Sequence, residues 1–358
     1  MSKYVMFCRK HTGLYGRFLQ SSLLLMACLT LFTSCYERGR LLKPETKVSL
    51  LLSLSNPSVS LSTDTVDVTL TRAPLPSQQR VVVFAYQDDI LVASETSVIS
   101  TQSGTFELPL NIKLDPTAYT LTVWTDYVQG SEAISSAYNI SPTGRVSCVA
   151  PYKGSDPWRE AYYATAAIDL SEFADKYEAD VEIDMTLHRP TAQFRVVTDG
   201  VQEFLDATAD KSVLDKYTVT FSYNFSFPTT FDIRQGQPVG SEENISYTVP
   251  LNLNTTDDES LLGFDDVFTG ATGSFVSLNV VIKDNTGQLL AEYDDIRVDY
   301  TPNKVNVIRG SFLPIVRDLP GLEEPEEPGD EPDQDGDSGV QIDSDYDGDI
   351  DINLDEAE

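Results

Sequence analysis

Strict alternation of apolar and polar residues is the feature that most limits how this chain can fold. In the stretch YTVTFSYNFSF (217–227), aromatic or branched side chains alternate with Ser, Thr and Asn at every position. The segments FELPLNIKL (106–114) and VEIDMTL (181–187) repeat the pattern. A period of two places all the apolar side chains of a strand on one face. The pattern therefore predicts half-buried strands in antiparallel sheets.

Other segments extend this all-β interpretation. RVVVFAY (80–86) is continuously apolar, which predicts a central strand. The segment 276–300 predicts two strands around a turn at Asp284-Asn285-Thr286-Gly287, with a third strand beginning near Ile296. Helical patterns are limited to VQEFLDA (201–207) and SEFADKY (171–177). We expect an all-β fold of two tandem sandwiches with few short helices.

Charge is distributed unevenly along the 358 residues. The net charge is −31, of which residues 1–34 carry +4, residues 35–317 carry −17 and residues 318–358 carry −18. A chain this acidic repels polyanions, so nucleic acid is excluded as a partner.

The N-terminus has the three parts of a secretory signal. Basic residues extend to Arg17, an apolar run covers 18–32, and the small residues Thr33 and Ser34 lead to Cys35. The apolar run is too short to span a bilayer comfortably. A cysteine directly after small residues and directly before charge is typical of a bacterial lipoprotein box, in which the thiol receives a lipid. The alternative is an ordinary cleaved signal with an incidental cysteine.

Cys35 is preferred as the lipid attachment site over Cys28. Leu25-Met26-Ala27-Cys28 fits the local pattern equally well, but cleavage there would leave the apolar residues 29–32 exposed. The mature chain then holds one other cysteine, Cys148, which is interpreted as a small buried apolar residue. Two cysteines, one of them lipidated, form neither a disulfide framework nor a zinc site.

Composition divides the chain into five parts. These are a signal peptide at 1–34, a tether at 35–46, an N-terminal sandwich at 47–187, a C-terminal sandwich at 188–317 and an acidic linker with a terminal strand segment at 318–358. The boundary at 187/188 is placed where His188-Arg189-Pro190 interrupts a strand ladder. The Pro- and acid-rich residues after Asp318 predict a disordered, self-repelling linker.

Four segments carry a resemblance to a known family. They are YTLTVWTDYV (119–128), DPWREAYYATAAIDL (156–170), LHRPTAQFRVVTDG (187–200) and VNVIRGSFL (305–313). Their order, together with the lipoprotein signal, resembles the fimbrillin-like surface lipoproteins of Bacteroidales, which supply subunits and anchors of type V pili. The resemblance covers nearly the whole mature chain, although the family's RTN sequence in the closing strand is not preserved.

The resemblance implies two transthyretin-like sandwiches delivered to the outer membrane as a lipid-anchored precursor. In related pilins an arginine-specific protease removes the N-terminal strand, and a strand from a neighbouring subunit fills the groove. Arg72, which precedes Ala73-Pro74 in an expected loop, is the candidate cleavage site. An exposed arginine at a strand end is the ordinary alternative. Stalk and tip subunits lose their lipid in this way, whereas anchors keep it.

Residues for catalysis or metal binding are sparse. His188 is the single histidine of the mature chain and has no evident partner, so we expect a protein that is not an enzyme and has no cofactor. The segment 343–356 matches part of a calcium loop, but position twelve is Leu354 rather than Glu. No designed metal site is expected. The aromatic residues Tyr152, Trp158, Tyr162 and Tyr163 suggest either a glycan platform or, by preference, ordinary packing.

The C-terminal segment also shows strand periodicity. Five branched apolar residues alternate with polar ones on both sides of the acidic turn 346–349, namely Val340, Ile342, Ile350, Ile352 and Leu354. We expect a strand pair that either packs on its own domain or is donated to a neighbouring subunit.

Together these features predict a lipid-anchored structural protein of the outer membrane, facing the cell surface and serving as a fimbrial subunit or anchor that supports adhesion. Its expected partners are other fimbrial subunits, the membrane through lipid, and a ligand on a host or microbial surface. The alternative function is that of a surface glycan-binding lipoprotein in a polysaccharide-capture system.

Overall fold

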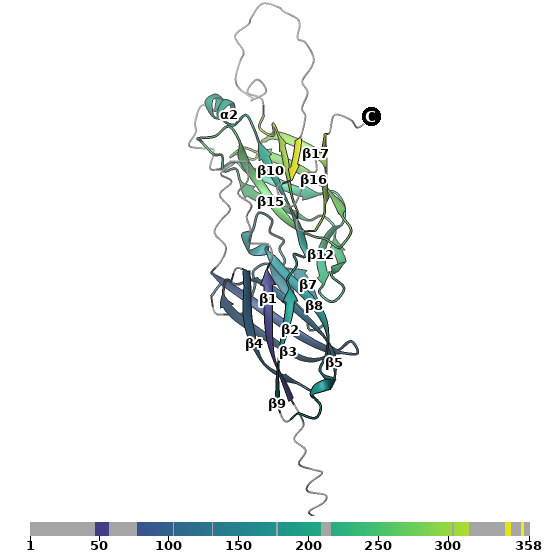
Figure 1. Cartoon of the computed structure of the whole chain (residues 1–358). Coiled ribbons are helices and arrows are strands. Elements are labelled where there is room, and N and C mark those ends of the chain that lie inside the picture. Colours follow the sequence, from purple (N-terminus) through teal and green to yellow (C-terminus); the bar gives the residue numbers. More distant parts are fainter. Residues whose placement is uncertain are drawn as a thin grey trace, which may run out of the picture.

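The computed structural model describes residues 47–56, 77–102, 104–130, 132–176, 178–208, 216–302, 304–314, 341–344 and 352–353. Within these ranges the chain is built almost entirely of strands, which confirms the prediction of an all-β sandwich fold. The described part is elongated, with strands β1–β5 and β9 at one end and β10, β15, β16 and β17 at the other (Figure 1). None of the helices in the described ranges is long and apolar enough to cross a membrane.

Sheets A and B form the N-terminal sandwich. Sheet A has the order β4-β1-β9, and sheet B has the order β3-β2-β5-β8. The strands are β1 (Lys47–Asn56), β2 (Gln78–Gln87), β3 (Ile90–Ser100), β4 (Gly104–Leu114), β5 (Ala118–Tyr127), β8 (Ala161–Asp169) and β9 (Glu178–Thr186). The short 3-10 helix η3 (Ser171–Phe173) lies within the segment 171–177, where a helical pattern was seen in the sequence.

Sheets D and E form the C-terminal sandwich. Sheet D has the order β15-β10-β18-β19-β20, and sheet E has the order β14-β11-β16-β17. Their strands are β10 (Thr191–Thr198), β11 (Thr218–Tyr223), β14 (Ser246–Pro250), β15 (Ser260–Phe268), β16 (Ser274–Lys283), β17 (Leu289–Tyr300), β18 (Val305–Gly310), β19 (Gln341–Ser344) and β20 (Ile352–Asn353). The helix α2 (Val201–Ala207) confirms the helix predicted there.

Sheet C joins the two sandwiches, with the order β13-β12-β7-β6. Strands β6 (Tyr138–Ile140) and β7 (Arg145–Cys148) precede position 188, whereas β12 (Phe227–Asp232) and β13 (Gln237–Glu242) follow it. Strands β7 and β12 pair through Phe231 and Val146, among others. The 3-10 helix η2 (Pro157–Arg159) follows β7. Each sandwich therefore contributes a hairpin to one shared sheet.

Sheet B is a middle layer because both of its faces are covered. Val81 and Val83 of β2 belong to an apolar cluster shared with sheet A. Val82 and Phe84 belong to a second cluster that includes Phe231 of sheet C. Strand β2 is therefore buried along nearly its whole length and pairs with both β3 and β5. The prediction of a central strand at 80–86 is confirmed.

Two strand pairings differ from the expected antiparallel sheets. Strand β1 pairs with β9 in parallel, and β10 pairs with β18 in parallel. Strand β1 thus lies beside β9, the last strand of its sandwich, and β10 lies beside β18, which precedes β19 and β20. Local periodicity shows which face of a strand is buried, but it does not determine the direction of the neighbouring strand.

Two predicted strand boundaries were wrong. The segment 217–227 does not form one strand, because β11 ends at Tyr223 and β12 begins at Phe227. No third strand begins near Ile296, because β17 continues from Leu289 to Tyr300 across a register shift, with Asp295 at a φ of 57°. The predicted turn at 284–287 is confirmed, with Gly287 at a φ of 85° and the Asp284 carboxylate accepting hydrogen bonds from the backbone of Thr286 and Gln288.

Candidate functional site

The residues predicted from sequence to carry function fall mostly outside the described ranges. Cys35, Arg72, Val340, Ile350 and Leu354 all lie outside them, so the lipidation, cleavage and strand-donation predictions stay predictions. Two others are placed by their backbones, Ile342 in β19 and Ile352 in β20.

Strand β1 is the central strand of sheet A. Its ten residues pair with β4 on one side and with β9 on the other. Four of its side chains, Val48, Leu50, Leu52 and Leu54, are at most 2% exposed and belong to the core of the N-terminal sandwich. An exposed ion pair at its start joins Lys47 Nζ to Asp115 Oδ1 at 2.6 Å. Strand β1 is therefore held by backbone pairing with both neighbouring strands and by apolar side chains that pack into the core.

The edge strand β4 is contacted by a carboxylate where its ladder with β1 is irregular, between Pro109 and Lys113. The backbone N–H groups of Asn111 and Ile112 donate to Glu95 Oε2 at 2.7 and 3.1 Å, and the Asn111 side-chain amide donates to Glu95 Oε1 at 2.7 Å. Pro109 of the same strand has no N–H group to offer. A charged side chain and a proline on an edge strand hinder pairing with a further strand.

The β18 edge of sheet D, which corresponds to the β9 edge of sheet A, is extended by residues of the chain's own C-terminal segment. Strand β19 pairs antiparallel with β18, with Ile342 opposite Ile308, and β20 pairs with β19, with Ile352 opposite Ile342. Residues 341–344 and 352–353 thus form ladder contacts within the same chain. Whether this segment is donated to a neighbour stays a prediction.

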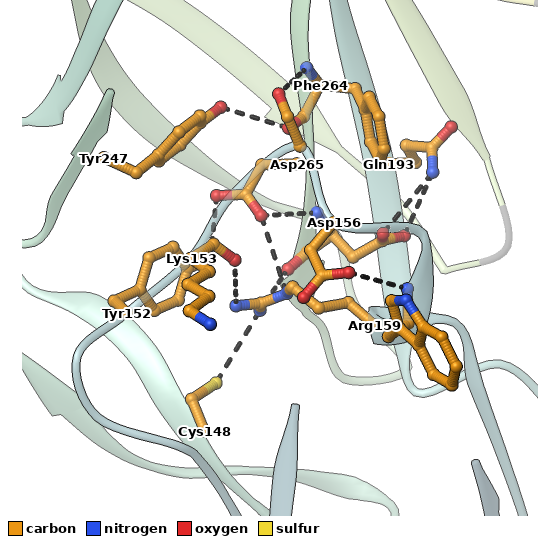
Figure 2. Close-up of polar contacts among 12 residues, drawn as sticks. Cys148, Tyr152, Lys153, Asp156, Arg159, Gln193, Tyr247, Phe264 and Asp265 are labelled. Carbon is orange, nitrogen blue, oxygen red and sulfur yellow. Dashed lines mark hydrogen bonds and ion pairs between the residues drawn. The ribbon is translucent and has the colours of Figure 1, made fainter. Parts of the chain in front are cut away.

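A buried ion pair lies where the two sandwiches meet (Figure 2). Arg159 of η2 is 3% exposed and Asp265 of β15 is fully buried, with Arg159 Nε 3.6 Å from Asp265 Oδ1. Arg159 Nη2 donates to the Asp266 carbonyl at 2.8 Å and contacts Cys148 Sγ at 3.6 Å. This group of residues is called the joint below. It links η2 of the first half to β15 of the second.

Two tyrosine hydroxyls also donate hydrogen bonds to the Asp265 carboxylate. Tyr152 and Tyr223 both donate to Asp265 Oδ2, at 2.7 and 2.5 Å. The Arg159 guanidinium lies 4.3 Å from the centre of the Tyr152 ring, a cation–π contact. Burial raises the pKa of the Asp265 carboxyl, while Arg159 and the two hydroxyls act in the opposite direction. A buried carboxylate with this many hydrogen-bond donors holds η2 and β15 in position. Both oxygens of Asp265 already have partners.

Burial also raises the pKa values of the tyrosine side chains near Asp265. The pKa values of Tyr152 and Tyr223 are raised well above 10 by burial, and the neighbouring Asp265 carboxylate raises them further. The pKa of Tyr247, whose hydroxyl donates to the Phe264 carbonyl at 3.1 Å, is raised well above 10 by burial and then by Asp265. These phenols stay neutral at physiological pH and act as hydrogen-bond donors.

The four aromatic residues considered as a glycan platform pack inside the protein. Tyr162 is buried between sheets A and B, and Trp158 and Tyr163 pack against the cluster that joins sheets B and C. Tyr152 packs edge-on against Phe227, 5.1 Å between ring centres. Their role in the structure is packing, which was the preferred interpretation of the sequence.

His188 and two further arginines make contacts within the protein. The His188 side chain is exposed; its backbone bridges Tyr163, and the two rings lie 6.2 Å apart. Arg189 pairs with Glu160 at 2.6 Å, and the buried Arg80 pairs with Asp126 through two hydrogen bonds. In the part of the chain that the structure describes, no three His, Cys, Asp or Glu side chains converge on a point where a metal ion could bind. Most of the acidic segment 343–356 lies outside that part.

Sequence patterns did not identify the joint or the Glu95 contact. Arg159 and Asp265 lie in different halves of the chain. Arg159 belongs to the segment 156–170, but that motif does not indicate a partner for it. The available signal was indirect: an arginine among aromatic residues in DPWREAYY, and paired aspartates inside the apolar segment LLGFDDVF (261–268). Charged residues inside apolar segments are often paired when buried.

Several solved structures are similar to this chain at low identity. A proposed adhesin from Bacteroides ovatus is 14% identical, with 69% of this chain and 78% of that chain covered and a TM-score of 0.42. The fimbrial anchor protein Mfa2 from Porphyromonas gingivalis is 12% identical, with 74% and 91% covered and a TM-score of 0.40. A proposed polysaccharide-binding protein from Bacteroides thetaiotaomicron is 9% identical, with 75% and 94% covered and a TM-score of 0.42.

No curated protein matches the chain significantly. A family model described as "Family of unknown function (DUF6562)" matches residues 44–357, which is most of the chain. The protein therefore belongs to the DUF6562 family.

Proposed function

We propose that this protein is a lipid-anchored structural protein of the cell surface, a fimbrial subunit or anchor that assembles by β-strand addition and supports adhesion. The proposal gives it the same kind of role as the adhesin and fimbrial anchor named above. It rests on the strands of this chain and on its sequence motifs, not on that structural likeness.

The observation that carries the proposal is the position of β1. It lies between β4 and β9 and fills the core with four apolar side chains, yet it is joined to β2 by residues 57–76. That connection holds one arginine, Arg72, and no lysine. Cleavage there would leave β1 held by non-covalent contacts alone. If β1 departed, a strand with apolar residues at every second position could take its place between β4 and β9.

The C-terminal segment is the proposed donor strand. Val340 and Ile342, then Ile350, Ile352 and Leu354, follow the same period as Val48, Leu50, Leu52 and Leu54. Residues 341–344 pair with β18 of their own chain, so donation would exchange that ladder for one in a neighbour. Proteins that keep β1 would accept no strand and would serve as anchors.

Cleavage is tested with an arginine-specific protease on the purified chain. We expect one cut in the segment 57–76, after Arg72, followed by release of the N-terminal piece and growth of oligomers on a native gel. The matched variant Arg72→Lys keeps the charge but resists this protease, and trypsin should still cut it. A protein that is cut at Arg72 yet stays monomeric with β1 in place would contradict assembly by strand addition.

Lipid anchoring has a separate test. Cys35→Ala should abolish labelling with palmitate and retention in the membrane fraction, while Cys28→Ala should leave both unchanged. The lipid is proposed to hold the protein in the outer membrane through Cys35. Retention and labelling of the Cys35→Ala variant would assign the anchor to another residue.

A further inference from the structure

A polar groove of about 660 Å³ lies between the end of β14 and the beginning of β15. Its apolar surface includes Val249, Pro250 and Leu253, and its polar surface includes Asn252, Asp257 and Glu259. A volume of this size is typical of pockets for small molecules or for part of a chain-like ligand. The function proposed above does not use this groove.

Hydrogen bonds within the lining hold the groove in shape. The Asn254 backbone N–H donates to Ser260 Oγ at 2.9 Å, and Ser260 Oγ donates to the Asn252 carbonyl at 3.1 Å. Ser155, from the loop before η2, accepts from the Phe264 backbone N–H at 3.0 Å. The groove is therefore largely preformed, and one residue of its lining, Ser155, comes from the first half of the chain.

The polar side chains keep unused hydrogen-bonding capacity. The Asn252 side chain is exposed, and within the described residues its amide makes no hydrogen bond. Asp257 accepts the Asn254 amide at 2.5 Å through Oδ2, which leaves Oδ1 available. Glu259 faces Arg309 Nε at 3.7 Å through Oε2, which leaves Oε1 available. The groove thus offers one amide, which both donates and accepts, and two carboxylate oxygens that accept.

Charge narrows the class of ligand. Among the described residues that line the groove there is no lysine, arginine or histidine, so an anionic ligand would meet two carboxylates without a compensating cation. Each carboxylate already has a partner in Arg309 or Asn254, which reduces the attraction for a cationic ligand. Hydroxyl groups of a ligand match the unused hydrogen-bonding capacity of the groove, because they donate to carboxylates and accept from amides.

We propose that this groove binds a neutral saccharide. The apolar C–H face of a pyranose ring would lie on Val249, Pro250 and Leu253, and its hydroxyls would bind Asn252, Asp257 and Glu259. The ligand class follows from the lining alone. The saccharide proposal and the strand-addition proposal can fail separately. The protein could assemble by strand addition without binding a saccharide, or bind a saccharide without assembling.

The test measures binding of five neutral oligosaccharides to the purified chain by isothermal titration calorimetry. The probes are maltohexaose, laminarihexaose, xylohexaose, mannohexaose and chitohexaose in its N-acetylated form. Heparin and a lysine-rich peptide are titrated beside them as an anionic and a cationic ligand. We expect at least one to bind, and we expect Asn252→Ala and Asp257→Ala each to weaken that binding at least tenfold, which is about 1.4 kcal/mol. Glu292→Ala, an exposed carboxylate on β17 outside the groove, is the matched control and should bind as the parent does.

Three results would overturn the proposal: no binding of any probe, binding that both groove variants retain, or binding only of heparin or of a lysine-rich peptide. Thermal unfolding of each variant checks that it is folded. Asp257→Asn keeps the shape of the side chain and replaces Asp257→Ala if that variant unfolds. It should still weaken binding, because an amide offers one acceptor oxygen where the carboxylate offered two.

Discussion

The two sandwiches have the same order of strands but differ in the side chains that form their cores. The sheet order β4-β1-β9 corresponds to β15-β10-β18, and β3-β2-β5-β8 corresponds to β14-β11-β16-β17. In both, the first strand lies inside a sheet, with a parallel neighbour on one side, β9 beside β1 and β18 beside β10. In the described residues, the N-terminal core holds two buried aromatic side chains and the C-terminal core holds eight. The same order of strands therefore tolerates both an aliphatic and an aromatic core.

The connections after the two first strands also differ. Residues 57–76 after β1 hold Arg72 and no lysine, whereas residues 199–217 after β10 hold Lys211 and Lys216 and no arginine. An arginine-specific protease could separate β1 from its sandwich but could not separate β10. The difference shows how one of two similar sandwiches could be specialised for strand exchange while the other stays intact.

The two sandwiches protect equivalent edges by different means. The edge strand β4 is contacted by Glu95 from its own sandwich, whereas the edge strand β15 is contacted by Ser155 from the other half of the chain. At the far side, β9 has no further strand in the described residues, while β18 is followed by β19 and β20. Each of these contrasts can be tested by substitution.

Loss of β1 should have the largest effect. A chain lacking residues 1–76 should lose the N-terminal sandwich, because each buried leucine of β1 contributes about 1.5–3 kcal/mol. Hydrogen exchange should show unprotected amides in β4 and β9 and protected amides in β10 and β16. Adding the peptide KVSLLLSLSN should restore protection, whereas a peptide with serine at positions 50, 52 and 54 should not. Full protection of β4 and β9 without any peptide would show that β1 is dispensable.

Disruption of the joint should have the next largest effect. Asp265→Ala leaves Arg159 buried without its counter-ion, so the free energy of unfolding should fall by about 3–5 kcal/mol. Urea denaturation measures this change. Asp299→Ala, which removes an exposed partner of Arg297, is the matched control and should change stability little. Equal effects of the two substitutions would mean that the joint does not stabilise the contact between the sandwiches.

Alkaline pH should destabilise the aromatic sandwich more than the aliphatic one. Tyr152, Tyr223 and Tyr247 have pKa values well above 10 in the folded state, whereas unfolded phenols ionise near a pH of about 10. Above that pH the unfolded state binds fewer protons than the folded state, so stability falls as pH rises. The loss is about 1.4 kcal/mol per pH unit for each such tyrosine.

Denaturation between pH 9 and 11.5 measures this dependence. Tyr223→Phe should reduce the slope by about 1.4 kcal/mol per pH unit above pH 10, because one ionisable phenol is removed. An unchanged slope in the variant would mean that Tyr223 ionises as readily in the folded protein as in the unfolded chain.

Removal of the Glu95 carboxylate should have the smallest effect on stability. Glu95→Ala leaves the N–H groups of Asn111 and Ile112 without their acceptor, at a cost of about 1–2 kcal/mol. The open edge should also pair with other chains, which light scattering would detect as association that grows with concentration. Glu95→Gln retains an acceptor oxygen and should associate less. A monomeric Glu95→Ala variant would show that Pro109 alone protects the edge.

The sequence by itself determined the local features of the fold. Alternation at 106–114 and 181–187 identified strands and their buried faces, and the continuous run at 80–86 identified a central strand. The turn at 284–287 and the helix at 201–207 were also predictable, because each depends on residues that are neighbours in the chain.

Only the tertiary structure decided which distant segments meet. Periodicity is the same for parallel and antiparallel neighbours, so it could not place β1 beside β9 or β10 beside β18. Nor could it show that hairpins from both halves share sheet C, or that Glu95 contacts the edge strand β4. The contact between Arg159 and Asp265 depends on how η2 and β15 pack, and a single sequence records the two charges without recording that they meet.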